Sequence, residues 1–197
     1  MDNLLEKGIS RMNGNNKEAI AFVVSLKECA KNKDLQNGMR IHENIVQKGL
    51  FGRNPYVGTS LINMYIKCGL ISKAQNVFDE LPDRNIASWN VMISGYVRNG
   101  LPEEALRCFI RMRSDGLLPN AVTFTSALMA CGRARSLDKG KEIHDEIWKN
   151  GLLRSRFLCD KDKEICDSFS ENELSGIRYV FANGKRIHED INNKELL

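Results

Sequence analysis

Residues 86–120 decide the fold, and they read IASWNVMISGYVRNGLPEEALRCFIRMRSDGLLPN. Large apolar side chains recur in this stretch at intervals of three and four residues, which predicts two amphipathic helices and no strand. An Asn-Gly pair at 99–100 separates the helices, and Pro102 with two glutamates begins the second, where proline and acidic side chains are favoured. Gly116 and Pro119 end the second helix. The stretch is therefore a predicted helix–turn–helix.

The same pattern recurs along the chain without gaps. Residues 19–50 match residues 121–152 at an offset of 102, residues 61–78 match 92–109 at an offset of 31, and the repeat at 86 matches the one at 121 at an offset of 35. This alignment, called the register below, predicts four repeats of 36, 31, 35 and 36 residues, at 19–54, 55–85, 86–120 and 121–156. Residues 1–18 are expected to be an N-terminal cap or a truncated preceding repeat.

One helical pair of this size cannot bury its apolar face, but stacked pairs can. The sequence therefore predicts an all-α fold, an α-solenoid of stacked helix–turn–helix repeats. The 197 residues are 42% hydrophobic and 27% charged, which is typical of a folded chain. No apolar run approaches the roughly 18 residues of a membrane span, so none is expected.

The distribution of charge divides the chain into two parts, and its cysteines indicate the redox compartment. Residues 1–156 hold 23 basic and 16 acidic residues, a net charge of +7, and residues 157–197 hold 6 and 9, a net charge of −3. The repeat pattern stops at the same place, so 157–197 is expected to be a short, irregular, poorly packed acidic extension. The Asn-Gly pair at 183–184 also allows a hairpin cap, and a foreign or disordered end is a further alternative. Six cysteines without a CxxC pair indicate a reducing compartment.

Four strings carry a family resemblance: GTSLINMYIKCG at 58–69, AQNVFDELPDRN at 74–85, SWNVMISGYVRNG at 88–100 and GKEIH at 140–144. They resemble pentatricopeptide repeats. The alternation of long, short and standard repeats further resembles the mixed-length class of land-plant organellar RNA-processing and RNA-editing factors. The resemblance covers residues 19–156 and implies a mitochondrial or chloroplast protein, although acidic residues in 1–16 argue against a transit peptide in this chain.

The alternative family is the tetratricopeptide repeat, a protein-binding solenoid without RNA contact. Trp89, Tyr96, Ala105 and Phe109 fit its large and small positions. That repeat requires glycine where Ile93 stands, however, and keeps a constant 34 residues. Both departures disfavour it.

The resemblance implies a reader of single-stranded organellar RNA that uses a few side chains per repeat for each base. In this family the fifth and last residues of a repeat contact the base edge. By the family's pairing preferences, Thr59 with Asn85 implies adenine, and Asn90 with Asn120 implies a pyrimidine, with cytosine favoured. Asparagine is also common at helix starts because its side chain bonds nearby backbone, so capping is the alternative role.

Two further sets of base contacts follow from the resemblance. The second residue of a repeat clamps the base face, which implies Ala87 and Val122, although Ala87 is small for that role. The long repeats fit less well, because Val23 cannot hydrogen-bond a base and Thr125 is paired with Arg156 in an unusual combination. We expect the long repeats to discriminate bases weakly. The helical spacing of Trp89, Tyr65 and Tyr96 marks them as core and not as stacking platforms.

Lys67, Arg98 and Arg133 occupy equivalent positions in three successive repeats. A row of cations at one repeated position is suited to contact RNA phosphates. The alternative is that each cation complements the dipole at a helix end.

Catalysis is not expected. Zinc deamination needs a ligating histidine, a nearby glutamate and two cysteines at CxxC spacing. His144 and Glu146 have the HxE spelling inside a repeat helix only, and Cys159, Cys166 and His188 lack a fourth ligand and the usual spacing. The sequence therefore predicts no metal site, no cofactor and no enzyme, and any deaminase would be a separate protein supplied in trans.

Overall fold

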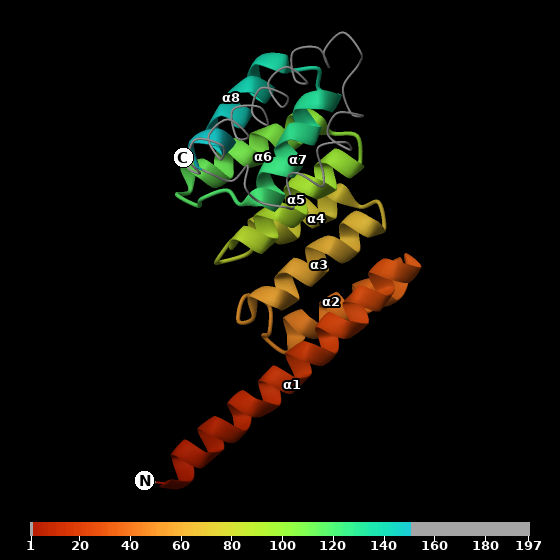
Figure 1. The fold of residues 1–197 in the computed structure, drawn as a ribbon. Helices are drawn as coiled ribbons and strands as arrows, with labels where there is room; N and C mark the ends of the chain where they lie inside the picture. The colour runs from red at the N-terminus through yellow and green to blue at the C-terminus, as the bar shows by residue number, and fades with distance from the viewer. Residues whose placement is uncertain (1, 151–197) are drawn as a thin grey trace, which may run out of the picture. The chain divides into compact units, whose positions relative to one another are not determined.

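The computed structural model describes residues 2–150, and the side chains of residues 16–150 apart from Leu137 and Trp148. The described residues form helices, turns and loops without a strand, so the predicted all-α repeat solenoid is confirmed (Figure 1). The predicted C-terminal extension at 157–197 lies outside the described residues. The helices are α1 (Asp2–Asn32), α2 (Leu35–Gln47), α3 (Pro55–Lys67), α4 (Ile71–Asp79), α5 (Ile86–Arg98), α6 (Pro102–Ser114), α7 (Ala121–Arg133) and α8 (Leu137–Lys149).

The odd-numbered helices are the first helices of the predicted repeats, and the even-numbered ones are the second. α3, α5 and α7 begin at Pro55, Ile86 and Ala121, which are the first residues of three predicted repeats. α1 begins earlier, so residues 2–18 are helical and continuous with the first helix of repeat 19–54. The assignment of residues 1–18 to a cap or to a preceding repeat stays a prediction.

The backbone repeats with the same register. The fifteenth residue of each repeat follows the first helix and has a positive φ in all four cases: Lys33 at 55°, Gly69 at 80°, Gly100 at 73° and Arg135 at 52°. This left-handed conformation turns the chain into the second helix, and glycine adopts it without steric cost. The eighth residue is buried in every repeat, as Leu26, Ile62, Ile93 and Leu128.

The difference in length between the short and standard repeats lies in the second helix. α4 has nine residues and α6 has thirteen, which accounts for the four residues that separate repeats of 31 and 35. Leu81, just beyond α4, is 5% exposed and occupies the place of buried Met112 in α6. This buried position of the longer helix is thus kept just beyond the end of the shorter one.

The described part of the chain divides into two compact parts, residues 2–95 and residues 96–150. In the first part, α1 packs on α2 and α3, and α3 packs on α4. Trp89 is fully buried, and its ring lies edge-on to Phe78 with 4.7 Å between the ring centroids. Gly95 allows a close helix contact, because a Cβ there would lie 2.5 Å from Ile66 Cδ1.

In the second part, α7 packs on both α6 and α8. Phe109 of α6 and Phe124 of α7 form its aromatic contact, with 6.0 Å between the ring centroids. Burial of such rings is among the largest hydrophobic contributions that single side chains make. The first and second helices of this part therefore share one apolar core.

Candidate nucleic-acid interface

The last residue of three repeats is an asparagine that caps the next first helix. Asn54 Oδ1 accepts from the backbone N–H of Tyr56 at 2.9 Å, and Asn85 Oδ1 accepts from that of Ser88 at 3.0 Å. Asn120 Oδ1 accepts from the backbone N–H of Thr123 at 3.1 Å, in a reciprocal capping box. The structure therefore gives Asn85 and Asn120 the capping role that the sequence left as an alternative. The oxygen of Asn85 accepts one bond from the helix, and the amide NH₂ group of this side chain carries two further donors.

The predicted base-reading residues at the fifth position differ in exposure. Thr59 is half-buried, and its hydroxyl donates to the carbonyl of Pro55 at 2.8 Å. Asn90 is also half-buried, next to the buried Trp89. Thr125 makes the bond equivalent to that of Thr59, to Ala121 at 2.8 Å, but it is only 6% exposed. Base contact by Thr125 stays a prediction and requires this side chain to become accessible.

The second position carries exposed side chains in all four repeats. The predicted clamp residues Ala87 and Val122 are exposed. The equivalent residues Ile20 and Tyr56 were not among the sequence predictions, and they are 58% and 71% exposed. The register could have identified both. Large apolar side chains exposed at one repeated position, beside the capping asparagines, are suited to contact the faces of planar bases.

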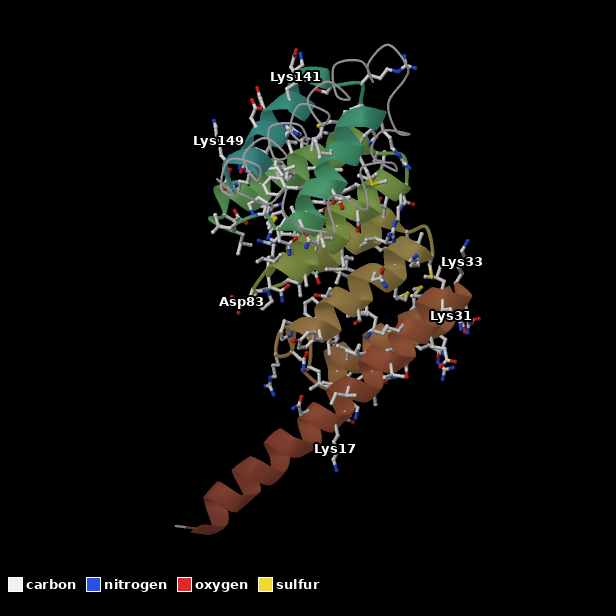
Figure 2. All side chains as sticks on the ribbon, viewed as in Figure 1. Lys17, Lys31, Lys33, Asp83, Lys141 and Lys149 are labelled. Carbon is white, nitrogen blue, oxygen red and sulfur yellow. The ribbon has the colours of Figure 1, made fainter. Side chains whose placement is uncertain are left out.

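The thirteenth position carries an exposed cation in all four repeats. Lys67, Arg98 and Arg133 lie in the last turns of α3, α5 and α7. Lys31 occupies the same position in α1 and was missed, although the offset of 102 places it over Arg133. Figure 2 shows Lys31 at the C-terminal end of α1. Arg133 also has a structural role, because its Nη1 donates to the backbone carbonyl of Val97.

Of the aromatic residues expected in the core, Trp89 and Tyr65 are buried, and Tyr96 is buried only in part. Tyr65 is 3% exposed, and its hydroxyl lies 2.8 Å from His42 Nδ1. Tyr96 is half-buried. Burial lowers the pKa of His42 below its ordinary value, and the charges of Glu80 and Glu43 oppose this effect. The burial of Trp89 and Tyr65 makes these two rings poor platforms for base stacking.

The histidine and cysteine side chains are not arranged as a metal site in the described part of the chain. His144 lies in α8 and is 6% exposed, and burial lowers its pKa, with Asp145 opposing the shift. Burial raises the pKa of Cys131 to about 12, so its thiol stays protonated at neutral pH. No cluster of three or more His, Cys, Asp or Glu suited to a metal ion occurs between residues 2 and 150. Cys159, Cys166 and His188 lie outside this range. None of the described helices has the length and apolar content that crossing a membrane requires.

The repeats match known family models. Residues 84–133 match the model described as PPR repeat family, and residues 59–86 and 122–152 each match the model described as PPR repeat. The chain contains PPR (pentatricopeptide) repeats. The matched family is thus the one that the sequence favours over the tetratricopeptide alternative.

Curated relatives in Arabidopsis thaliana agree with this assignment. The pentatricopeptide repeat-containing protein At2g03380, mitochondrial, is 41% identical over 133 residues, and At4g18520, chloroplastic, is 38% identical over 133 residues. Each match covers 68% of this chain, and 19% and 21% of the two relatives. The chain thus spans about a fifth of the length of the relatives it matches.

Solved structures share the fold. PPR10 in complex with an 18-nucleotide psaJ RNA element has a TM-score of 0.61 and 23% identity, over 83% of this chain and 25% of that one. The PPR domain of Arabidopsis thaliana protein-only RNase P 1 in complex with tRNA has a TM-score of 0.50 and 16% identity, over 80% of this chain and 95% of that one. At these identities the similarity establishes the fold.

Proposed function

We propose that the PPR repeats of this chain bind single-stranded RNA. The observation that carries the proposal is the exposed cation at the thirteenth position of all four first helices: Lys31, Lys67, Arg98 and Arg133. A basic residue lies in the last turn of all four first helices but of only two second helices, α6 and α8, so a helix dipole alone does not account for the pattern. Cations repeated once per helical pair suit the repeated phosphates of an RNA strand. PPR10 and the RNase P domain were solved with RNA, which supports the proposal.

We infer that the bases lie at the opposite ends of the first helices. The exposed second residues would contact the base faces, and the capping asparagines would address the base edges. An amide NH₂ group donates a hydrogen bond, so it complements the ring nitrogen acceptors of adenine and cytosine better than the ring N–H of guanine and uracil. This polarity agrees with the proposed readings of adenine by Thr59 with Asn85 and of cytosine by Asn90 with Asn120.

The finer assignment is also a proposal. Repeats of unequal length support membership of the mixed-length class, whose proteins act in organellar RNA editing or processing. Relatives named mitochondrial and chloroplastic support an organellar location. We propose that the chain serves as a binding module without catalysis, and that any deaminase is a separate protein.

Fluorescence anisotropy with short labelled RNAs, at low and moderate salt, tests the function. The chain should bind single-stranded RNA in preference to duplex RNA of the same sequence. Lys67→Ala should weaken binding to all RNAs alike, whereas Asn90→Ala should change the preference at one base. Lys17→Ala is the matched control, because Lys17 is an exposed α1 lysine outside the repeated position (Figure 2).

Two outcomes would reject the proposal. One is no binding of single-stranded RNA by a properly folded chain at low salt. The other is an equal loss of affinity in Lys67→Ala and Lys17→Ala, which would mean that the cations at the thirteenth position act only through the overall charge of the chain. An equal loss on every RNA from Asn90→Ala would reject the base assignment alone.

A further inference from the structure

Two depressions lie between the second helices of successive repeats, one in each compact part. The first, of about 310 Å³, lies between α2 and α4, and the second lies between α6 and α8. They share register positions on the side of the following repeat, whereas the preceding repeat contributes different positions to each. In each, the following repeat contributes its twenty-second and twenty-sixth residues, Asn76 and Glu80 in the first and Glu142 and Glu146 in the second.

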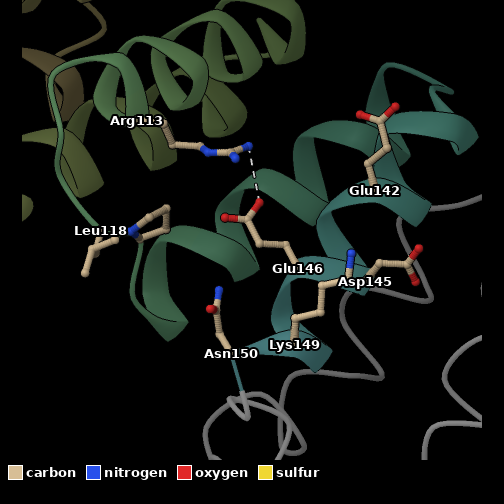
Figure 3. Close-up of a pocket in the computed structure, with 8 residues that line it drawn as sticks. Arg113, Leu118, Glu142, Asp145, Glu146, Lys149 and Asn150 are labelled. Carbon is tan, nitrogen blue, oxygen red and sulfur yellow. Dashed lines mark ion pairs between the residues drawn. The ribbon is translucent and has the colours of Figure 1, made fainter.

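An arginine crosses the α6–α8 depression. Arg113 of α6 extends toward α8, and its Nη1 lies 3.2 Å from Glu146 Oε2 (Figure 3). Arg113 is the twenty-eighth residue of its repeat. The carboxylate of the twenty-sixth residue in the next repeat thus binds a guanidinium within this molecule.

The α2–α4 depression has the carboxylate but lacks the arginine. Glu80 occupies the position of Glu146. The register position of Arg113 is held by Val46, which is 55% exposed and is not among the residues that line the depression. Glu43 of α2 adds a second carboxylate to the lining. Within the described residues neither Glu43 nor Glu80 forms an ion pair, in contrast to Glu146.

The floor of the α2–α4 depression suits the aliphatic part of a long side chain. Val77, Met39 and Tyr65 line it, and the Tyr65 hydroxyl lies 2.8 Å from His42 Nδ1. Lys73 is the lysine of the lining, and it lies against the apolar wall, with its Nζ 3.8 Å from Met39 Sδ and 6.0 Å from the centroid of the Tyr65 ring. Apolar walls below a charged rim are the surroundings in which arginine buries its stem and pairs its head.

We propose that the α2–α4 depression binds an arginine side chain of a partner protein, with the guanidinium paired to Glu80 and Glu43. The site would do for a partner what the α6–α8 depression does internally for Arg113. It is formed mainly by second helices, whereas the proposed RNA contacts lie on first helices, so it does not depend on RNA binding. The partner is thus defined by an accessible arginine at its surface.

The probe is the peptide acetyl-Ala-Arg-Ala-amide, titrated into the full-length chain while the side-chain NMR signals of Tyr65 and His42 are followed. The same peptide with citrulline, which is neutral and nearly isosteric, is the matched ligand control. The arginine peptide should shift both signals, and the citrulline peptide should shift them much less. Glu80→Gln should weaken binding about two- to fivefold, the range of an exposed ion pair. Glu28→Gln, an exposed acid of α1, should leave it unchanged.

A gain-of-charge variant tests the comparison between the two depressions directly. Val46→Arg should place a guanidinium beside Glu80, as Arg113 lies beside Glu146, and should abolish peptide binding. Equal shifts with arginine and citrulline, no shift at all, or unchanged binding in Glu80→Gln would each overturn the proposal. Should Val46→Arg fail to fold, the Glu80→Gln and citrulline comparisons decide the matter alone.

Discussion

Asn85 has a structural and a proposed recognition role, and substitutions can separate them. Asn85→Ala should lower the free energy of unfolding by about 1 kcal/mol, because the N–H of Ser88 loses its cap. Asn85→Asp should change the free energy of unfolding by no more than about a few tenths of a kcal/mol relative to the unsubstituted chain, because aspartate caps equally well. It should nevertheless present an acceptor where the amide presented a donor, and so shift preference toward guanine or uracil at one base. Chemical unfolding and RNA anisotropy measure the two effects.

A stable Asn85→Asp variant with unchanged base preference would restrict Asn85 to capping. Asn44→Asp is a suitable control for the added negative charge, since Asn44 is exposed on α2, away from the helix starts.

His42 and His144 link stability to pH. Burial lowers the pKa of both groups below 6.5. The folded state therefore binds protons less readily than the unfolded state, and the free energy of unfolding should fall as pH falls below about 6.5, until the folded-state values are passed. Thermal unfolding between pH 5 and 8 measures this. His42→Gln should flatten part of the dependence, and an unchanged profile would contradict the assignment.

At the residue scale, local spacing predicts burial better than it predicts bonds. The helical interval alone places Trp89 in the core. The contact of Arg133 with the Val97 carbonyl and that of His42 with Tyr65 join residues 36 and 23 positions apart, and no local pattern encodes such pairs. Thr59 and Thr125 are equivalent in the register but differ in exposure, because their tertiary neighbours differ.

At the scale of the elements, the turn between the first and second helices of each repeat has a conserved backbone conformation in the described residues. Its fifteenth-position residue has a positive φ whether it is glycine or not. A residue with a side chain is destabilised by roughly 1–2 kcal/mol in this conformation. Glycine avoids this steric cost but loses more conformational entropy on folding, which offsets part of its advantage. Lys33→Gly should therefore stabilise the chain by about 0.5–1 kcal/mol, and Gly69→Ala should destabilise it by about 1–2 kcal/mol.

Chemical denaturation of the two variants measures the pair of changes. Lys17→Gly, inside α1, is the control and should destabilise by about 1 kcal/mol, as glycine does in a helix interior. Destabilisation by Lys33→Gly as well would contradict the shared backbone conformation.

The elements themselves follow from the sequence more closely than the site does. The Asn-Gly break, the proline at a second-helix start and the apolar intervals are local signals, and the helices α5 and α6 lie where those signals place them. The register also contains Lys31, Ile20 and Tyr56, but only their exposure in the structure distinguishes them from ordinary helix residues.

For the whole molecule, the cation row makes a quantitative prediction about salt. For single-stranded RNA, each phosphate contact contributes about −0.7 to the slope of log K, the logarithm of the binding constant, against the logarithm of the salt concentration. Four contacts should give a slope of about −3, and Lys67→Ala should reduce its size by about 0.7. Anisotropy titrations from 50 to 300 mM salt, roughly the range in which such slopes are resolved, provide the measurement. A slope near zero would mean that the cations do not touch phosphates.

The missing last turn of α4 shows which length changes this architecture tolerates. Four residues rotate a helix by about 400°, which is close to one full revolution. A second helix can therefore lose or gain one turn while its apolar stripe returns to nearly the same direction. A loss of two residues inside a helix would rotate the following part of the stripe by about 200° and expose it to water. Viable insertions and deletions in second helices should thus come in steps of about one turn, so length variation among such repeats is quantised by helical geometry.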